Sequence, residues 1–191
     1  MSEEAKAELN KELNEELSAK PSKIIQLGHP TLRKIAEPVT HILSNETQQL
    51  IKNMLTTVEV AGGVGIAAPQ INSSQRIFIM CSKPNTRYPD APLMAPTAII
   101  NPKILSKSNE TEKDWEGCLS VPSIRGLVPR YKSITVEYSN AKGEHHTETF
   151  THFVARIFQH ELDHLDGLTF VDRVESTQDL FSEEEWRKQF I

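Results

Sequence analysis

The sequence has no long apolar segment and few cysteines. None of its 191 residues belongs to a run near the roughly 18 consecutive apolar residues that a membrane helix needs. Two cysteines are too few for a disulfide scaffold. The first residues, MSEEAKAELN, are acidic where a secretory signal is basic and then apolar. We therefore expect a cytoplasmic globular protein that has no membrane partner.

The sequence also has fewer basic than acidic residues. The chain has 21 Lys and Arg against 26 Asp and Glu, which gives a formal net charge of −5. Nucleic-acid-binding proteins usually carry a basic patch, so direct nucleic-acid recognition is not expected. Hydrophobic residues make up 38% of the chain, which is enough to form a core. The length predicts one main domain with an added tail.

Four segments have helical patterns. Residues 1–20 are polar, with leucines four apart, and predict a helical extension that is either an accessory arm or a docking helix for a partner. Residues 45–60 have an apolar stripe and a good N-cap in Ser44. Helical patterns return over residues 152–165 and, with acidic character, over residues 176–191. Helices are thus expected at both ends of the chain and inside it.

The middle of the chain predicts strands. Residues 76–81, 97–100 and 134–138 are short and rich in β-branched or aromatic side chains, and a turn leads into a further strand that ends near Phe150. Residues 83–96 contain four prolines and are predicted to form a loop. Clustered strands with helices before and after them indicate the α+β class.

Histidine spacing in the segment QHELDH points to a metal ion. The H-E-x-x-H motif places His160 and His164 one helical turn apart on the same face, so both imidazoles can bind one cation. Glu161 lies where it can take a proton from an attacking water molecule without binding the metal itself. Two ordinary surface histidines explain the segment poorly, because the neighbouring helix positions are apolar.

The third ligand decides the class of metalloprotein. A metzincin is excluded because Phe170 stands where its last histidine would be. A thermolysin-like metalloprotease would use a downstream glutamate, Glu183 or Glu184, whereas Cys118 in EGCLSVP is the competing ligand. Cys81 lies in an apolar strand and fits the core better. A module in which the ion only stabilises the fold is a further alternative.

Three segments resemble the signature motifs of the peptide deformylase family. They are GVGIAAPQ at residues 63–70, EGCLSVP at 116–122 and QHELDHLDG at 159–167. They occur in the family's order, and the similarity extends over about residues 24–173. The main departure is Ile66, where the first motif usually has Leu, a near-isosteric change.

The resemblance implies an α+β fold in which antiparallel β-sheets pack around a central metal-binding helix, with N- and C-terminal helices. It also implies hydrolysis of the formyl group from N-formylmethionine at the start of newly synthesised polypeptides. One divalent metal ion per chain would be held by Cys118, His160 and His164. The family association favours Fe²⁺ as the native metal, while Zn²⁺, Ni²⁺ or Co²⁺ can occupy the same ligands.

The resemblance assigns further roles around the metal. Glu161 would accept and return a proton, and the Gln70 side-chain amide and the Leu119 backbone N–H would stabilise the oxyanion. A solvated loop amide is the alternative for Gln70. The predicted substrate-binding residues are Gly63, Val64, Gly65, Gly117, Arg125 and Ile157. The glycines would let a substrate strand approach the backbone, Ile157 would line the methionine pocket, and Arg125 would contact substrate carbonyls or form a surface salt bridge.

The expected partners are N-formylmethionyl nascent polypeptides. Transient association with the ribosome is possible for an enzyme that acts on nascent chains. The sequence shows no docking surface for it, and the acidic stretch at residues 182–186 is a poor match for ribosomal RNA. Residues 21–191 would form the single catalytic domain, and residues 1–20 lie outside the resemblance.

Overall fold

The computed structural model describes residues 19–84 and 91–190. The helix predicted over residues 1–20 falls almost entirely outside these ranges, so it and the predicted boundary after residue 20 stay predictions. Among the helices of the described residues, none has the length and apolar character to cross a membrane.

Two antiparallel sheets contain the described strands. The larger sheet has the order β1-β2-β3-β6-β7, with the bounds β1 (Gly65–Ala67), β2 (Ile77–Ser82), β3 (Met94–Lys107), β6 (Ser133–Ser139) and β7 (His145–Thr151). The smaller sheet has the order β4-β5-β8, with the bounds β4 (Thr111–Cys118), β5 (Val121–Tyr131) and β8 (Leu180–Ser182). This arrangement confirms the α+β prediction.

Three α-helices accompany the sheets within the described ranges. They are α2 (Asn45–Val60), α3 (His152–Leu165) and α4 (Glu183–Phe190). Four short 3₁₀ turns join the larger elements: η1 (Pro30–Arg33), η2 (Ala68–Ile71), η3 (Phe170–Asp172) and η4 (Thr177–Asp179). The bounds of α2 and α3 confirm the helices predicted for those residues.

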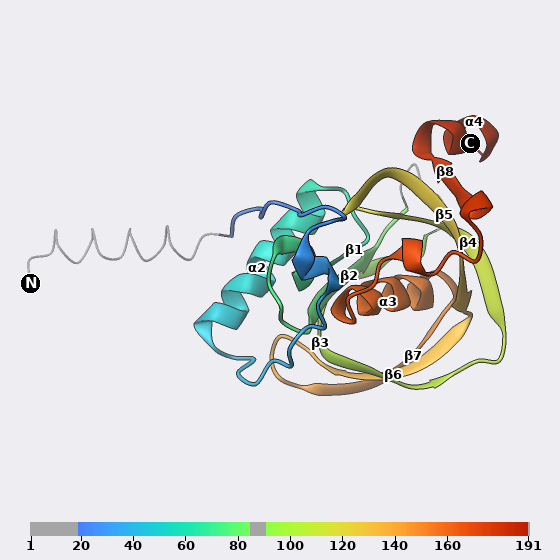
Figure 1. The fold of residues 1–191 in the computed structure, drawn as a ribbon. Helices are drawn as coiled ribbons and strands as arrows, with labels where there is room; N and C mark the ends of the chain where they lie inside the picture. The colour runs from blue at the N-terminus through green and yellow to red at the C-terminus, as the bar shows by residue number, and fades with distance from the viewer. Residues whose placement is uncertain (1–18, 85–90, 191) are drawn as a thin grey trace, which may run out of the picture.

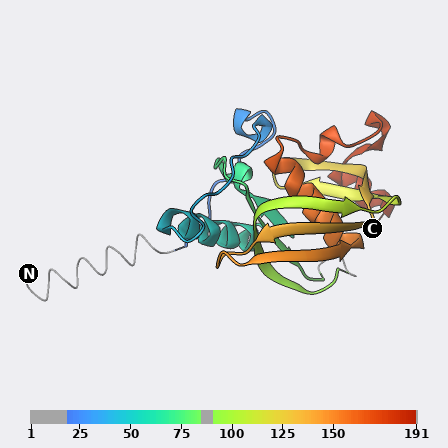
Figure 2. The ribbon, with the colours of Figure 1, turned by 90° about the horizontal axis from the view of Figure 1, so that it is seen from below.

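Helix α3 lies at the centre of the fold, between the two sheets (Figures 1 and 2). Its residues Ala155, Phe158 and Leu165 are fully buried. The ring of Phe158 meets that of Phe78 on β2 edge to face, with 5.1 Å between the ring centroids. Because apolar burial is the main favourable contribution to folding, these contacts fix the helix that carries the H-E-x-x-H motif.

Helix α2 covers a second core against β1, β2 and β3. Its stripe of Ile51, Met54 and Val58 is buried in one cluster with apolar residues of these strands. The helix begins where Ser44 accepts a hydrogen bond from the Thr47 backbone N–H at 3.2 Å, as a good N-cap does. Strand β1, which precedes the 3₁₀ turn that contains Gln70, contacts both α2 and α3.

The C-terminal tail differs from the prediction. Residues 176–191 do not form one helix: Thr177–Asp179 form a 3₁₀ turn, Leu180–Ser182 form β8, and α4 begins at Glu183. The helical pattern was misleading here because the backbone of Leu180–Ser182 pairs with the edge of β5, with Phe181 opposite Arg125. Tertiary pairing thus overrides local propensity in this short segment.

The strand predictions were incomplete. Strands β4 and β5 were not predicted. Strand β3 is much longer than residues 97–100, because it runs from Met94 to Lys107, so the end of the loop predicted over residues 83–96 is strand instead. The first half of β4 is exposed and charged, so it shows little of the apolar alternation that marks a strand. Its pairing with β5, from Thr111 opposite Tyr131 to Cys118 opposite Val121, defines it instead.

Gly126 on β5 is required for packing. A Cβ atom placed there would lie 2.7 Å from Cε2 of Phe170 and 3.0 Å from Cγ1 of Val174. Phe170 is 1% exposed, so the ring has little space into which it could move. The absence of a side chain at this position lets the chain after α3 pack onto the smaller sheet.

Gly126→Ala is therefore expected to destabilise the fold by about 1–3 kcal/mol, as overpacking of a filled core does. The free energy of unfolding in urea measures this loss. The double variant Gly126→Ala/Phe170→Leu is the control, because the smaller Leu makes room for the methyl group. It should lose less stability than the two single variants added together. Strict additivity, or an unchanged stability of Gly126→Ala, would contradict the packing described.

Candidate metal centre and substrate cavity

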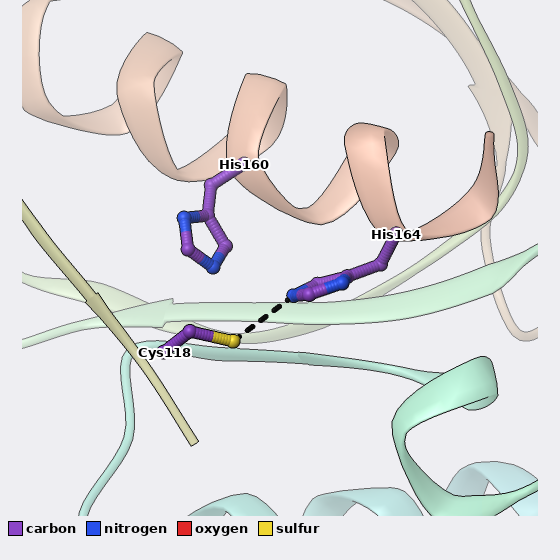
Figure 3. A group of neighbouring side chains, drawn as sticks. All are labelled: Cys118, His160 and His164. Atoms are coloured by element: carbon purple, nitrogen blue, oxygen red, sulfur yellow. Dashed lines mark hydrogen bonds between the residues drawn. The ribbon is translucent and has the colours of Figure 1, made fainter. Parts of the chain in front are cut away.

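The structure brings the three predicted metal ligands together. His160 and His164 point from one face of α3 toward Cys118, which ends β4 (Figure 3). The Cys118 Sγ lies 3.2 Å from the His164 Nε2, and one ligand atom from each residue falls within 4.8 Å of the others. A thiolate and two imidazoles are a donor set that suits Zn²⁺ or Fe²⁺. These residues fit a divalent cation with three protein ligands, the number typical of catalytic rather than structural sites.

Cys118 is set up to bind as a thiolate. Burial opposes ionisation of its thiol, but the neighbouring His164 and His160 rings outweigh this and lower its pKa to about 5. The sulfur also accepts hydrogen bonds from the Ser120 backbone N–H and the Gln70 Nε2, each at 3.4 Å. A thiolate is the metal-binding form of cysteine, so Cys118 is ready to bind a cation at neutral pH. Cys81, by contrast, lies half-buried on β2, and burial raises its pKa.

Glu116 orients the first histidine. Its Oε2 lies 2.9 Å from the His160 Nδ1, which leaves Nε2 as the ring nitrogen that can bind a metal. Arg130 donates to both carboxylate oxygens of Glu116, at 2.9 and 3.0 Å, and Arg156 donates to Oε1 at 2.9 Å. Burial opposes ionisation of Glu116, but Arg130 and His160 hold the pKa of this carboxyl well below its usual range. The carboxylate is therefore a fixed, charged acceptor.

Asp163 on α3 extends this network. It accepts a hydrogen bond from Arg130 at 2.6 Å and another from Arg173 at 2.5 Å. Arg130 therefore joins Glu116 on β4 to Asp163 on α3, and all three side chains are buried. Removal of one partner from such a buried pair typically costs about 3–5 kcal/mol, because the other charge is left without compensation. The network holds the cysteine strand and the histidine helix in one geometry.

Glu161 lies beside the ligands in a tight space. A Cβ atom at Gly65 would collide with its carboxylate, so β1 approaches α3 closely only because residue 65 is glycine. Glu161 is 4% exposed, and its Oε2 has no hydrogen-bond partner among the described residues. Burial raises its pKa to about 7, in spite of the two nearby histidines. A carboxyl group with a pKa near neutrality suits proton transfer.

Gln70 is buried beside Cys118. Its Oε1 accepts a hydrogen bond from the Ala67 backbone N–H at 2.8 Å, and its Nε2 donates to the Ser120 Oγ at 3.2 Å. The side chain is 1% exposed, so the alternative of a solvated loop amide is wrong. Leu119 lies in the turn between β4 and β5, directly after Cys118. Both residues predicted to stabilise an oxyanion therefore lie at the metal ligands.

A cavity of about 340 Å³ opens beside this centre. Cys118, His160 and Glu161 line it, while His164 is fully buried behind them. Gln70 and Leu119 also line the cavity. All the residues predicted to bind substrate are in its wall: Gly63, Val64, Gly65, Gly117, Arg125 and Ile157.

Glu183 is in the cavity wall but has a different role from the one considered for a thermolysin-like site. Its Oε1 binds the Arg125 Nη2 at 3.2 Å and the Arg187 Nη2 at 2.8 Å. Glu184 pairs instead with Lys188 at 2.9 Å. Neither glutamate belongs to the group of potential metal ligands found among the described residues, so a downstream glutamate as the third ligand is wrong. The Arg125 ion pair is also not a surface salt bridge, because the arginine side chain is 3% exposed.

Sequence reasoning missed several residues that shape the site. Glu116 was only part of a motif, and Arg130 and Arg156 had no role assigned. A signal existed for Arg156, since a charged residue stands among apolar ones on the helix that carries the histidines. Trp115 and Phe153, which also line the cavity, had no comparable signal because their positions depend on how β4 and α3 pack.

An ionised cysteine, two histidines and a buried carboxyl group beside an open cavity define a metal-dependent hydrolase site. The family model described as polypeptide deformylase matches residues 21–179 of the chain. The chain belongs to the polypeptide deformylase family, whose members are metal-dependent and remove the N-formyl group from nascent peptides. This confirms the resemblance and gives no support to the metalloprotease alternative.

Individual relatives agree with this assignment. "Peptide deformylase 2" of Nostoc sp. is 57% identical over 165 residues, which cover 86% of this chain and 92% of that protein. "Peptide deformylase 2" of Shewanella oneidensis is 42% identical over 170 residues, covering 89% and 93%. Among solved structures, the class I type b peptide deformylase from Acinetobacter baumannii with bound Met-Ala-Ser has a TM-score of 0.80 at 43% identity. The match covers 82% of this chain and 100% of that one.

Glu116→Gln is expected to weaken metal binding by about 10- to 100-fold, because an outer partner of a metal-binding histidine typically contributes that much. Competition with a chelator, on variants whose circular dichroism matches the wild type, measures the affinity. Glu112→Gln is the matched control, since Glu112 lies on the same strand and its side chain is half exposed. Wild-type affinity in both variants would show that Glu116 does not orient His160.

Proposed function

We propose that this chain hydrolyses the formyl amide of N-formylmethionyl polypeptides through Glu161, releasing formate and a free α-amino group. Membership of the polypeptide deformylase family supports the reaction. The observation that carries the assignment of roles is the position of Glu161, packed on Gly65 and lining the cavity with Cys118 and His160. A base, a cation site and a substrate cavity are the parts that hydrolysis of an amide requires.

The metal would be a single divalent ion held by Cys118, His160 and His164, with Fe²⁺ as the native ion. The chemistry of the three donors supports this set, and Zn²⁺, Ni²⁺ or Co²⁺ fit the same donors. When bound, the cation supplies Lewis acidity that activates the attacking water and stabilises developing negative charge. One thiolate and two neutral imidazoles leave a net positive charge on the centre for this purpose.

Glu161 moves the proton. Its carboxylate accepts a proton from the water molecule as the oxygen attacks the formyl carbon. It then returns that proton to the nitrogen of the departing amine, so the carboxylate is regenerated in each cycle. The positive charge of a bound cation favours the ionised carboxylate, which counteracts the effect of burial on its pKa.

Gln70 and Leu119 would stabilise the oxyanion of the tetrahedral intermediate. The Gln70 carboxamide is fixed because the Ala67 backbone N–H binds its oxygen, which leaves the NH₂ group facing Cys118. Pre-oriented donors of this kind contribute strongly to catalysis because they need no rearrangement when charge develops. The Leu119 backbone N–H, directly after a metal ligand, would be the second donor.

The substrate would lie along the glycine-containing walls of the cavity. Gly63, Gly65 and Gly117 line the cavity and allow close approach of a peptide backbone. Main-chain hydrogen bonds there would accept many different sequences after the first residue. The methionine side chain would enter the apolar part of the cavity, near Val64 and Ile157. Cytoplasmic location and transient association with the ribosome stay predictions.

The central test is release of formate from formyl-Met peptides by wild type and by Glu161→Ala. The variant should lose about 100- to 10,000-fold in kcat, which is the usual contribution of a general base, yet keep its metal. Cys118→Ala is the comparison variant and should lose metal and activity together. If wild type releases no formate, the proposed reaction is wrong. If Glu161→Ala keeps both metal and full turnover, the role of Glu161 is wrong.

The identity of the native metal has its own test. Iron-loaded protein should lose activity in air, because oxygen oxidises a ferrous–thiolate site and attacks Cys118. Metal exchange under reducing conditions should restore the activity, and nickel-loaded protein is the control that stays active. Aerobic activity of the iron form that is stable for days would contradict this expectation.

A further inference from the structure

The C-terminal segment, Leu180–Phe190, lies against the wall of the substrate cavity. Its strand β8 pairs with β5, and α4 follows directly (Figure 1). Phe181 and Phe190 each contact the ring of Trp115 on β4, with 5.0 Å between centroids in both cases. Trp186 on α4 is 6% exposed. The segment is therefore packed onto β4 and β5, the strands that carry Cys118 and Arg125.

The same segment supplies two contacts to the Arg125 guanidinium. Glu183 binds the Arg125 Nη2 at 3.2 Å, and the Cζ of Arg125 lies 5.0 Å from the centroid of the Trp186 ring. The ion pair offsets the cost of burying the charge. The indole face adds a cation–π attraction and restricts the plane of the guanidinium. Two side chains from the C-terminal segment thus contribute to the placement of this buried arginine.

Arg125 lies where a bound peptide would pass. A Cβ atom at Gly117 would collide with the guanidinium, so Arg125 rests directly against the backbone one residue before the metal ligand Cys118. Arg125, Gly117 and Glu183 all line the cavity. A guanidinium presents several N–H donors in one planar fork. The fork is well suited to donate to a peptide carbonyl that lies along Gly117.

We propose that Glu183 and Trp186 are positioning residues for Arg125, and that Arg125 donates a hydrogen bond to a main-chain carbonyl of the substrate beyond the formylmethionine. This inference rests on the proposed function and adds a role for the C-terminal segment. That segment sets how strongly the enzyme binds peptides longer than one residue. A purely structural role for Glu183 would affect substrates of every length equally, which makes substrate length the decisive variable.

The experiment compares Glu183→Gln with wild type on two substrates, formyl-Met-Ala-Ser and formyl-methioninamide. Glu183→Gln keeps a hydrogen-bond acceptor but removes the negative charge that holds the guanidinium. A displaced Arg125 loses its charged hydrogen bond to the substrate carbonyl, which corresponds to about a 10-fold loss in affinity. KM for the tripeptide should therefore rise about 10-fold while kcat changes less than about twofold, and kcat/KM for the short substrate should stay within about twofold. The dissociation constant of Met-Ala-Ser, measured by tryptophan fluorescence, should rise by the same factor as the tripeptide KM.

Glu185→Gln is the matched control. Glu185 lies in the same turn of α4, is half exposed and pairs with Lys188 rather than Arg125, so it should behave as wild type. Arg125→Lys keeps the charge and removes the planar fork, and should reproduce the Glu183→Gln effect. Because Glu183 acts through Arg125, the combined variant should lose no more than either single one.

The inference is overturned if Glu183→Gln binds the tripeptide as Glu185→Gln does, or if both substrates lose equally. Failure of the proposed function has a different signature, in which wild type releases no formate from either substrate. The Met-Ala-Ser binding comparison needs no turnover, so it tests the role of Glu183 in that case too.

Discussion

The Glu116 carboxylate links the helix and the strand that carry the three candidate metal ligands. It binds the Nδ1 of His160 on α3 while Arg130 and Arg156 hold it between β4 and the helix. Two metal ligands come from one helix and the third from the end of a strand in the smaller sheet, so their convergence requires a rigid link between helix and strand. A network of charged side chains joined by hydrogen bonds links helix and strand more rigidly than apolar contacts do, because hydrogen bonds are directional and define one geometry.

The pKa values of Cys118 and Glu161 shift in opposite directions because the two buried groups have different neighbours. Cys118 lies against two imidazoles, which lower its pKa despite burial, while burial dominates for Glu161 and raises its pKa. Cys118 thus favours the thiolate that a cation would bind, whereas Glu161 has a pKa near 7, which suits a group that accepts and returns a proton. Environments that push neighbouring titratable groups apart in this way are typical of active sites. The packing of α3 against Gly65 and β4 creates both environments.

The parts of the fold that follow a local pattern could be predicted from the sequence. The stripe of α2 and the H-E-x-x-H spacing of α3 are periodic, and three short motifs carried all the predicted site residues except Arg125 and Ile157. Strand β4 and the tail could not be predicted in the same way, because their conformation comes from pairing with β5 rather than from their own residues. The ion-pair partners described for Glu116 and Arg125 are 14 to 58 residues away in the chain, and only the folded structure identifies them.

The central claim is that one sulfur and two imidazole nitrogens bind a single cation. X-ray absorption spectroscopy of the zinc-loaded protein tests it most directly. The account predicts one sulfur at about 2.3 Å and two nitrogens at about 2.0–2.1 Å, with the sulfur signal absent in Cys118→Ser. A first shell of nitrogen and oxygen alone in the wild-type protein would contradict the account.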